Sequence, residues 1–261
     1  MAPLDITKLK LYYISFNKLP SLETELRSLG FVDVNLFEAI DGRKLDPFQL
    51  KEDGVISIRS FNELFTGDRR EVGGMPSMGA IGCALSHGAL LKKCVDENLD
   101  YIIVAESDVK LHYAPTQKTF NDIGKLMERP NTVVIGQYPG HYPYFTFKKS
   151  DIPNRKPTFF FGAHFVILSR GACEKLLEDF FPIDVQYDAY IAHMDTIGRV
   201  NAEPYNIASQ KVHLSSIQDF NIGCLFSQGV LHWGTLAVIL VLIIICITLG
   251  MRCRFYKSTA K

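Results

Sequence analysis

One segment of this chain, residues 79–111, predicts a helix followed by a buried strand, and it constrains the fold more than any other stretch. Small and apolar side chains recur there with the spacing of one helical face, at Ala84, Gly88, Leu91 and Val95. Ser77 is a suitable cap for the start of the helix, and the polar run 96–98 ends it. The apolar residues 101–105 suit a strand that is covered on both faces. This succession favours an α/β fold.

Two carboxylates, Glu106 and Asp108, follow directly after the predicted strand. In open α/β sheets, ligands bind beyond the carboxyl ends of the strands. A Glu-x-Asp pair there can offer two oxygens to a hard divalent cation, which in turn can hold a diphosphate. The alternative is that Glu106 caps the next helix and Asp108 is merely solvated. For an isolated acidic pair that alternative is favoured, because such pairs are common at strand ends.

The residues around this strand resemble glycosyltransferase family 25, the group of lipopolysaccharide galactosyltransferases and collagen hydroxylysine galactosyltransferases. The helix carries G-C-A-L-S-H at residues 82–87, where the family has G-C-x-L-S-H, and the strand ends in E-S-D-V at 106–109, where the family has E-D-D-V. Further matches follow in order over about residues 10–217. The resemblance implies a GT-A-like α/β domain with a mostly parallel sheet flanked by helices. It also implies a UDP-sugar donor and a divalent metal such as Mn²⁺.

The resemblance further implies which residues bind the metal and the nucleotide. It assigns the metal to Glu106 and Asp108, with His213 as a late histidine ligand, although a solvated surface position is the alternative for His213. Nucleotide or sugar contacts are implied for Tyr13, Ile14, Asp41, Ser86 and His87. Each has a structural alternative: strand packing for the first two, an Asp-Gly turn for Asp41, and helix packing for the last two.

An inverting transferase also needs a carboxylate that accepts the proton of the acceptor hydroxyl. Asp184, in a segment that resembles the family's P-[IV]-D, is our candidate, and Asp188 is the substitute. Four residues apart, they are expected to share one helical face. The alternative, which can coexist with the first, is that Asp184 caps a helix around residues 188–194.

Two functions are therefore weighed. The first is a metal-dependent inverting transferase that moves a hexose, galactose or glucose, from a UDP-sugar to a glycan or protein hydroxyl. The second is a catalytically inactive, membrane-tethered binding module with the same fold. Ser107 in place of the family's central Asp motivates the second, as does the first strand, where Ser15, Asn17 and Lys18 replace the family's Asn, Asp and Arg.

The C-terminal region has a different character from the rest of the chain. Residues 230–251 contain no charged side chain and would span about 33 Å as a helix, compared with about 30 Å for the hydrocarbon core of a bilayer. The sequence thus predicts a family 25-like domain at 1–218, a linker at 219–229, a transmembrane helix at 230–251 and a short basic tail at 252–261. Because the start of the chain does not resemble a secretory signal, we expect a single-pass membrane protein with a cytosolic catalytic domain. The positive-inside rule, applied to the basic tail, favours the opposite orientation.

Composition narrows the partners further. The formal net charge is zero, so no long-range field favours nucleic acid. The six cysteines include no C-x-x-C pair, and we expect all of them to be reduced.

Along the rest of the chain, we predict strands at 10–15, 32–37, 132–135 and 159–168, helices at 20–28, 117–128 and 172–180, and irregular structure at 43–76.

Overall fold

The fold is described from a computed structural model, which describes residues 9–66, 73–111, 116–136, 162–205 and 207–210. Residues 1–219 form one compact unit and residues 220–261 a second, and all described residues belong to the first. Among the described residues, none of the helices combines the length and hydrophobicity that a bilayer-spanning helix needs. The predicted transmembrane helix at 230–251 lies outside the described residues, as do the linker and the basic tail.

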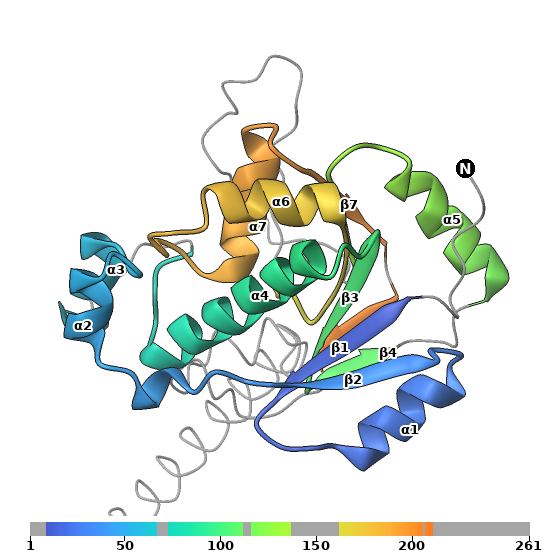
Figure 1. The fold of residues 1–261 in the computed structure, drawn as a ribbon, viewed down its shortest axis with the longest axis horizontal. Helices are drawn as coiled ribbons and strands as arrows, with labels where there is room; N and C mark the ends of the chain where they lie inside the picture. The colour runs from blue at the N-terminus through green and yellow to red at the C-terminus, as the bar shows by residue number, and fades with distance from the viewer. Residues whose placement is uncertain (1–8, 67–72, 112–115, 137–161, 206, 211–261) are drawn as a thin grey trace, which may run out of the picture. The chain divides into compact units, whose positions relative to one another are not determined.

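A six-stranded mixed sheet forms the centre of the first unit, with the strand order β2-β1-β3-β6-β5-β7 (Figure 1). Its strands are β1 (Lys10–Ser15), β2 (Asp33–Glu38), β3 (Tyr101–Glu106), β5 (Thr132–Ile135), β6 (Phe165–Ser169) and β7 (Asn201–Pro204). All of them except β6 run in the same direction, because β6 pairs antiparallel with both β3 and β5. A small antiparallel sheet joins β4 (Val109–Leu111) to β8 (Ala208–Gln210).

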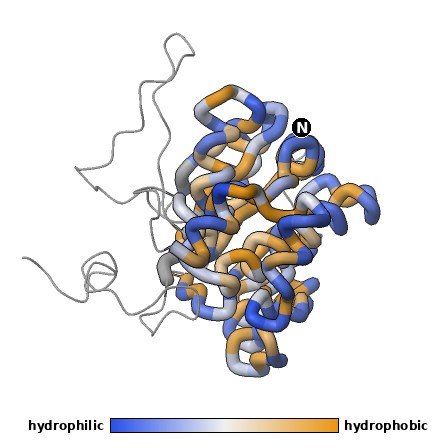
Figure 2. The backbone as a smooth tube through the Cα atoms, turned by 90° about the vertical axis from the view of Figure 1, so that its left-hand side faces the viewer, coloured by the Kyte–Doolittle hydropathy of each residue, from blue (hydrophilic) through white to orange (hydrophobic). Residues whose placement is uncertain are grey.

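Helices cover both faces of the central sheet. They are α1 (Pro20–Ser28), α2 (Pro47–Glu52), α3 (Ile58–Thr66), α4 (Met78–Asp96), α5 (Gln117–Met127), α6 (Arg170–Glu178) and α7 (Tyr187–Thr196). One apolar cluster joins α4, α6 and α7 to one face of the sheet, and a second joins α1 and α5 to the other. Hydrophilic and hydrophobic residues alternate along the helices, as expected for helices that are buried on one side (Figure 2).

Helix α4 and strand β3 form as the sequence predicts. The Ser77 side chain accepts a hydrogen bond from the backbone N–H of Ala80, which caps the helix, and the helix ends at Asp96. Strand β3 is buried from Ile102 to Ala105, because the helices of both clusters cover it. The prediction of an α/β sheet flanked by helices is therefore confirmed.

Three local predictions are wrong. Residues 43–76 are not irregular throughout, because they contain the short helices α2 and α3, and Asp46 caps α2 by accepting from the N–H of Phe48. The strand predicted at 159–168 begins at Phe165 in the described part of that range. Asp184 lies before α7, which starts at Tyr187, so it neither caps this helix nor shares a helical face with Asp188. The cap position belongs to Gln186 instead.

Candidate metal centre at the end of strand β3

The position of Glu106 follows from the alternation of side chains along β3. Ile102 and Val104 point into the cluster beneath α4, whereas Ile103 and Ala105 point to the opposite face. Because side chains alternate with a period of two, Glu106 lies on the face that α4 covers. It ends β3 at the carboxyl edge of the sheet, beside Ile14 of β1.

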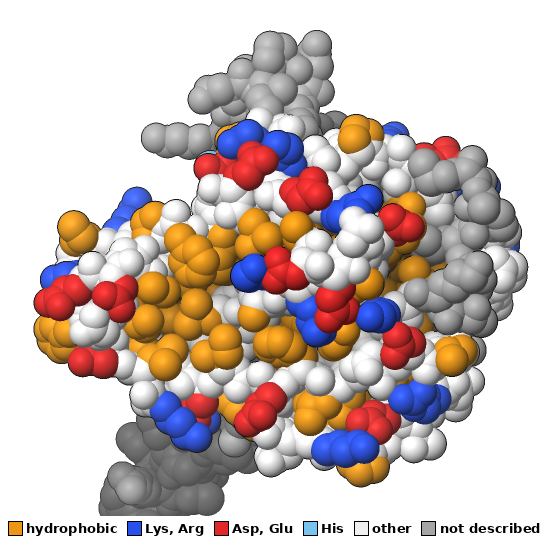
Figure 3. Space-filling model, in the orientation of Figure 1, with side chains coloured by type: hydrophobic (Ala, Val, Ile, Leu, Met, Phe, Trp, Pro, Cys, Tyr) orange, Lys and Arg blue, Asp and Glu red, His pale blue; other side chains and the backbone are white. Residues whose placement is uncertain are grey.

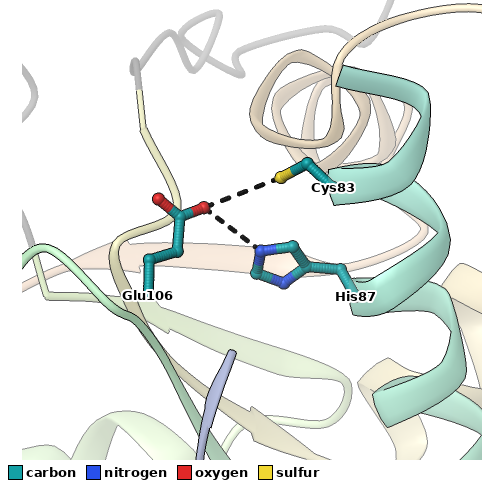
Figure 4. A group of neighbouring side chains, drawn as sticks. All are labelled: Cys83, His87 and Glu106. Atoms are coloured by element: carbon teal, nitrogen blue, oxygen red, sulfur yellow. Dashed lines mark hydrogen bonds and ion pairs between the residues drawn. The ribbon is translucent and has the colours of Figure 1, made fainter. Parts of the chain in front are cut away.

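Two residues of α4 contact this carboxylate (Figure 4). His87 Nε2 lies 3.3 Å from Glu106 Oε1, and the Cys83 thiol donates to the same oxygen over 3.8 Å. Cys83 and His87 are four residues apart, so successive turns of α4 present them side by side. Burial, followed by the nearby Glu106 charge, raises the pKa of the Cys83 thiol well above its ordinary value. The thiol is therefore protonated and acts as a weak donor.

A second histidine reaches Glu106 from strand β6. The register pairs Ala105 with Phe165, and the Glu106 N–H donates to the His164 carbonyl over 2.9 Å, so His164 is the cross-strand neighbour of Glu106. Its Nδ1 lies 2.6 Å from Glu106 Oε2 and 3.5 Å from Asp108 Oδ1. Burial lowers the pKa of His164, but the charge of Glu106 and the hydrogen bonds to Asp108 and Glu106 outweigh it and raise the pKa to about 10. For Glu106, burial acts in the opposite direction and raises the pKa. The two histidines outweigh it and bring the pKa of Glu106 well below its ordinary value.

Two overlapping groups of side chains have donor atoms close enough to share a cation. Donor atoms of Glu106, Asp108 and His164 lie within 4.8 Å of one another, and so do those of Cys83, His87 and Glu106. The first group offers carboxylate oxygens and one imidazole, which suit Mn²⁺ or Mg²⁺, whereas the second contains a thiol and suits softer metals. The donor set at Glu106, Asp108 and His164 therefore fits the divalent metal that the family implies. His213, the third predicted ligand, lies outside the described residues.

The first turn of α7 adds a buried side chain, Tyr187, and a half-buried one, Asp188, to this region. Tyr187 stacks on the His87 ring, with 4.1 Å between the ring centroids and an angle of 19° between the planes. Asp188 accepts hydrogen bonds from the N–H groups of Gly162 and Ala189, at 2.6 and 2.7 Å. Burial raises the pKa of Asp188, with a smaller contribution in the same direction from the charge of Glu106. Asp188, one of the two candidate bases from the sequence, therefore lies where the charges of Glu106 and His164 both affect its pKa.

The other base candidate, Asp184, is fastened to the start of α3. Its carboxylate accepts a hydrogen bond from Ser57, and its carbonyl accepts one from Ser60 over 2.9 Å. Asp184 also lines a cavity of about 640 Å³ beside α7, together with Phe180, Tyr187, Tyr190 and other mostly apolar residues. On the face shown in Figure 3, hydrophobic side chains gather between α3 and helices α4 and α6.

The motif residues near Asp41 have a packing role in the structure. Ser86 donates to the Gly82 carbonyl over 2.7 Å and accepts from the N–H of Ile40 over 2.9 Å, which fastens the turn after β2 to α4. A Cβ atom on Gly82 would lie 2.3 Å from the Ile40 carbonyl oxygen, so only glycine permits this approach. Asp41 caps the 3₁₀ turn (Gly42–Lys44) and holds the Arg43 side chain at 2.7 and 3.0 Å.

The two nucleotide-binding candidates on β1 are separated by the sheet. Tyr13 is buried on the face opposite Glu106, where its hydroxyl donates to Glu23 of α1 over 2.6 Å. Ile14 packs on the α4 face, and its backbone runs beside Glu106. The structure therefore brings Ile14 and His87 to Glu106, and it does not bring Tyr13 there.

Sequence reasoning missed His164 as a metal-site residue, as well as Cys83 and Tyr187. His164 comes immediately before an apolar strand, but only the register of β6 against β3 shows that it faces Glu106. Cys83 and His87 share an i, i+4 spacing, which was a usable signal. Nothing local in the sequence identifies Tyr187 as the stacking partner of His87.

Comparisons with known proteins identify the family of this chain. The model of glycosyltransferase family 25 (LPS biosynthesis protein) matches residues 12–191. The chain is 33% identical over 110 residues to "Procollagen galactosyltransferase 2" of Mus musculus, a match that covers 41% of this chain and 16% of that protein. A "Glycosyltransferase 25 family member" of Aedes aegypti is 30% identical over 104 residues, covering 38% of this chain and 16% of its own length. The matches thus span about a sixth of the length of these relatives.

Among solved structures, mouse xyloside xylosyltransferase 1 in its apo form matches with a TM-score of 0.31 and 12% identity over 74% of this chain and 66% of that one. Similarity at this level carries no argument about the fold. The family model is different, because it covers more than half of the chain and includes Cys83, His87, Glu106, His164 and Asp188. The chain therefore belongs to glycosyltransferase family 25.

Proposed function

We propose that this protein is a metal-dependent inverting glycosyltransferase of the GT-A type that transfers a hexose from a UDP-sugar to a hydroxyl of a glycan or protein. One observation carries the proposal: Glu106, Asp108 and His164 converge at the carboxyl edge of the sheet, with donor atoms within 4.8 Å of one another. This edge is where α/β sheets bind ligands. The names of the galactosyltransferase relatives make galactose the first sugar to test.

In this proposal, the carboxylates of Glu106 and Asp108 and the His164 imidazole would hold Mn²⁺ or a similar cation. When bound, the cation supplies positive charge that stabilises the leaving diphosphate. As a ligand, the His164 imidazole would be neutral, and the charges of the two carboxylates would balance the 2+ charge of the cation. The imidazole favours Mn²⁺ over Mg²⁺, because nitrogen ligands suit the transition metal better.

Asp188 is the better supported base of the two candidates. Its carboxylate is oriented by two backbone N–H groups and lies in the electrostatic environment of Glu106 and His164, whereas Asp184 is committed to Ser57. In the transfer, the acceptor oxygen forms a bond to the anomeric carbon while the bond to the diphosphate breaks. Asp188 takes the proton of the acceptor hydroxyl. Attack from the side opposite the leaving group inverts the configuration.

The inactive binding module is the second candidate, and the position of Ser107 weakens it. Ser107 is exposed, whereas Glu106 and Asp108 on either side of it both approach His164. Replacing the family's central Asp by Ser therefore leaves the donor group at Glu106, Asp108 and His164 complete.

We further propose that residues 230–251 anchor the protein in a membrane, with the catalytic domain in the cytosol.

The test measures UDP release by the full-length chain from UDP-galactose and UDP-glucose, with Mn²⁺ and with EDTA. We expect metal-dependent release that Asp108→Asn and Glu106→Gln reduce by roughly 100-fold or more, since each removes a ligand charge. Asp96→Asn is the matched control, because Asp96 is an exposed carboxylate on α4 that pairs with Lys92. If wild-type protein releases no UDP from any nucleotide sugar with any divalent metal, the binding module becomes the better interpretation.

A further inference from the structure

We infer that His87 and Tyr187 are positioning residues: His87 fixes the orientation of the Glu106 carboxylate, and Tyr187 fixes the His87 ring. The inference rests on the proposed function, because it concerns the carboxylate that would hold the cation. It assigns to the histidine of the G-C-A-L-S-H motif a role that does not require contact with the nucleotide. Four observations support it.

The first observation is that the two oxygens of Glu106 face different partners. Oε1 faces α4, where His87 Nε2 lies at 3.3 Å and the Cys83 thiol at 3.8 Å. Oε2 faces His164, whose Nδ1 lies at 2.6 Å and also approaches Asp108. The contacts of α4 therefore engage Oε1, while Oε2 faces His164, the residue that also approaches Asp108.

The second observation concerns the tautomer of His87. The ring is 1% exposed, and its Nδ1 has no hydrogen-bond partner among the described residues. A proton on Nδ1 alone would leave that buried donor unsatisfied and would set two acceptors, Nε2 and Glu106 Oε1, 3.3 Å apart. The Nε2–H tautomer avoids both costs and donates to Glu106 Oε1. His87 is thus a hydrogen-bond donor to the carboxylate.

The third observation is the support of the His87 ring by Tyr187. The rings are stacked at 4.1 Å, and Tyr187 is 4% exposed, so the imidazole plane is held on one side by a buried aromatic ring. Because the two planes lie 19° apart, it is the ring face of Tyr187 that contacts His87.

The fourth observation links both histidines to one turn of helix. Tyr187 supports His87, and the next residue, Asp188, binds the N–H of Gly162, two residues before His164. Consecutive residues at the start of α7 therefore support the two segments that carry His87 and His164 to Glu106. A shift of this turn would change both contacts at once.

The same geometry argues against His87 as a metal ligand itself. A histidine bound to a metal through one nitrogen ordinarily donates a hydrogen bond from the other. His87 Nδ1 has no such acceptor among the described residues. A thiolate-to-metal charge-transfer band on addition of Co²⁺, lost both in Cys83→Ser and in His87→Met, would show that Cys83 and His87 bind a cation and would overturn the inference.

The main test uses His87→Met and His87→Gln in the full-length chain. Methionine fills a similar volume without a donor, whereas the glutamine amide can donate from a position close to that of Nε2. We expect His87→Met to weaken Mn²⁺ binding, measured by calorimetry, by roughly 10- to 100-fold, with a parallel loss in kcat for UDP release. His87→Gln should stay within about threefold of wild type, because the donor is restored. The KM for the UDP-sugar, measured at saturating Mn²⁺, should change little in both variants.

Tyr187→Leu tests the stacking contact, and Tyr190→Leu is its control. Tyr190 lies one turn further along α7, and its hydroxyl donates to the Leu176 carbonyl, so its loss lowers stability without touching His87. Tyr187→Leu should weaken Mn²⁺ binding, and Tyr190→Leu should not. Equal Mn²⁺ affinities in these two variants would contradict the inference, and so would equal losses in His87→Met and His87→Gln.

A spectroscopic measurement separates this inference from the proposed function. In metal-free wild-type protein, long-range ¹⁵N–¹H spectra should show His87 as the Nε2–H tautomer, with the signal assigned by its absence in His87→Gln. This readout needs neither turnover nor a metal, and it remains available if His87→Met fails to fold. An Nδ1–H tautomer would overturn the inference, whereas wild-type protein that neither binds Mn²⁺ nor releases UDP would overturn the proposed function.

Discussion

The close approach of α4 to the turn after β2 leads to a specific prediction for Gly82→Ala. A Cβ atom at this position would lie 2.3 Å from the Ile40 carbonyl oxygen and 2.5 Å from the Gly42 nitrogen. Both are backbone atoms, so no side-chain rotation can relieve the contact. The turn would have to move away by roughly 1 Å to reach an ordinary separation. That movement would stretch the hydrogen bond between Ser86 Oγ and the Ile40 N–H.

The expected magnitude combines three effects. Alanine is favoured over glycine inside a helix by about 1 kcal/mol. Overpacking against a rigid neighbour costs about 1–3 kcal/mol. Weakening the hydrogen bond between Ser86 and Ile40 costs about 1 kcal/mol more. The free energy of unfolding of Gly82→Ala should therefore fall by about 1–3 kcal/mol relative to wild type.

Urea unfolding of the full-length chain, followed by circular dichroism, measures this difference. The matched control is Gly171→Ala in α6, where the nearest atom to an added Cβ is the Asn131 side-chain oxygen at 2.6 Å. That side chain can rotate, so we expect this control to lie between no change and about 1 kcal/mol of added stability. If Gly82→Ala is as stable as Gly171→Ala, the argument that this motif glycine serves backbone packing is refuted.

Three further predictions concern the same region. Ser86→Ala should lower the free energy of unfolding by about 1 kcal/mol in urea titrations, because the Ile40 N–H loses its acceptor. EDTA should abolish UDP release, and added Mn²⁺ should restore it; release that persists after dialysis against EDTA would contradict a metal requirement. Burial lowers the pKa of His164, but Glu106 and Asp108 raise it more, from 6.5 to about 10. The metal-free chain should therefore lose stability as the pH rises from about 6.5 to 10, and His164→Gln should flatten that slope in thermal melts.

The helix and strand around the motif could be predicted because their signals are local. The apolar spacing of α4, its cap at Ser77 and the apolar run of β3 all lie within one stretch of sequence. Helix α2 also carries a local signal, an Asp-Pro start at Asp46, but the many glycines and prolines around it favoured an irregular segment. Short helices are stabilised mainly by tertiary packing, which a sequence pattern does not reveal.

The site could be predicted only in part. Glu106 and Asp108 were found because they follow directly after a recognisable strand. His164 was not assigned to the site, because its place opposite Glu106 depends on the direction and register of β6. The resemblance to a family marks which residues recur and does not separate binding from packing. Gly82 and Ser86 belong to such a motif, yet in the structure they join two segments of backbone.

The reversed direction of β6 has a consequence for how this edge can tolerate change. In a purely parallel sheet, only the segments that leave strands reach the carboxyl edge, whereas here the segment that enters β6 reaches it as well. A single residue inserted between His164 and Phe165 would turn the imidazole to the other side of the sheet, away from Glu106. The spacing at this one junction must therefore be kept, while additions further upstream leave the pairing of β6 with β3 untouched.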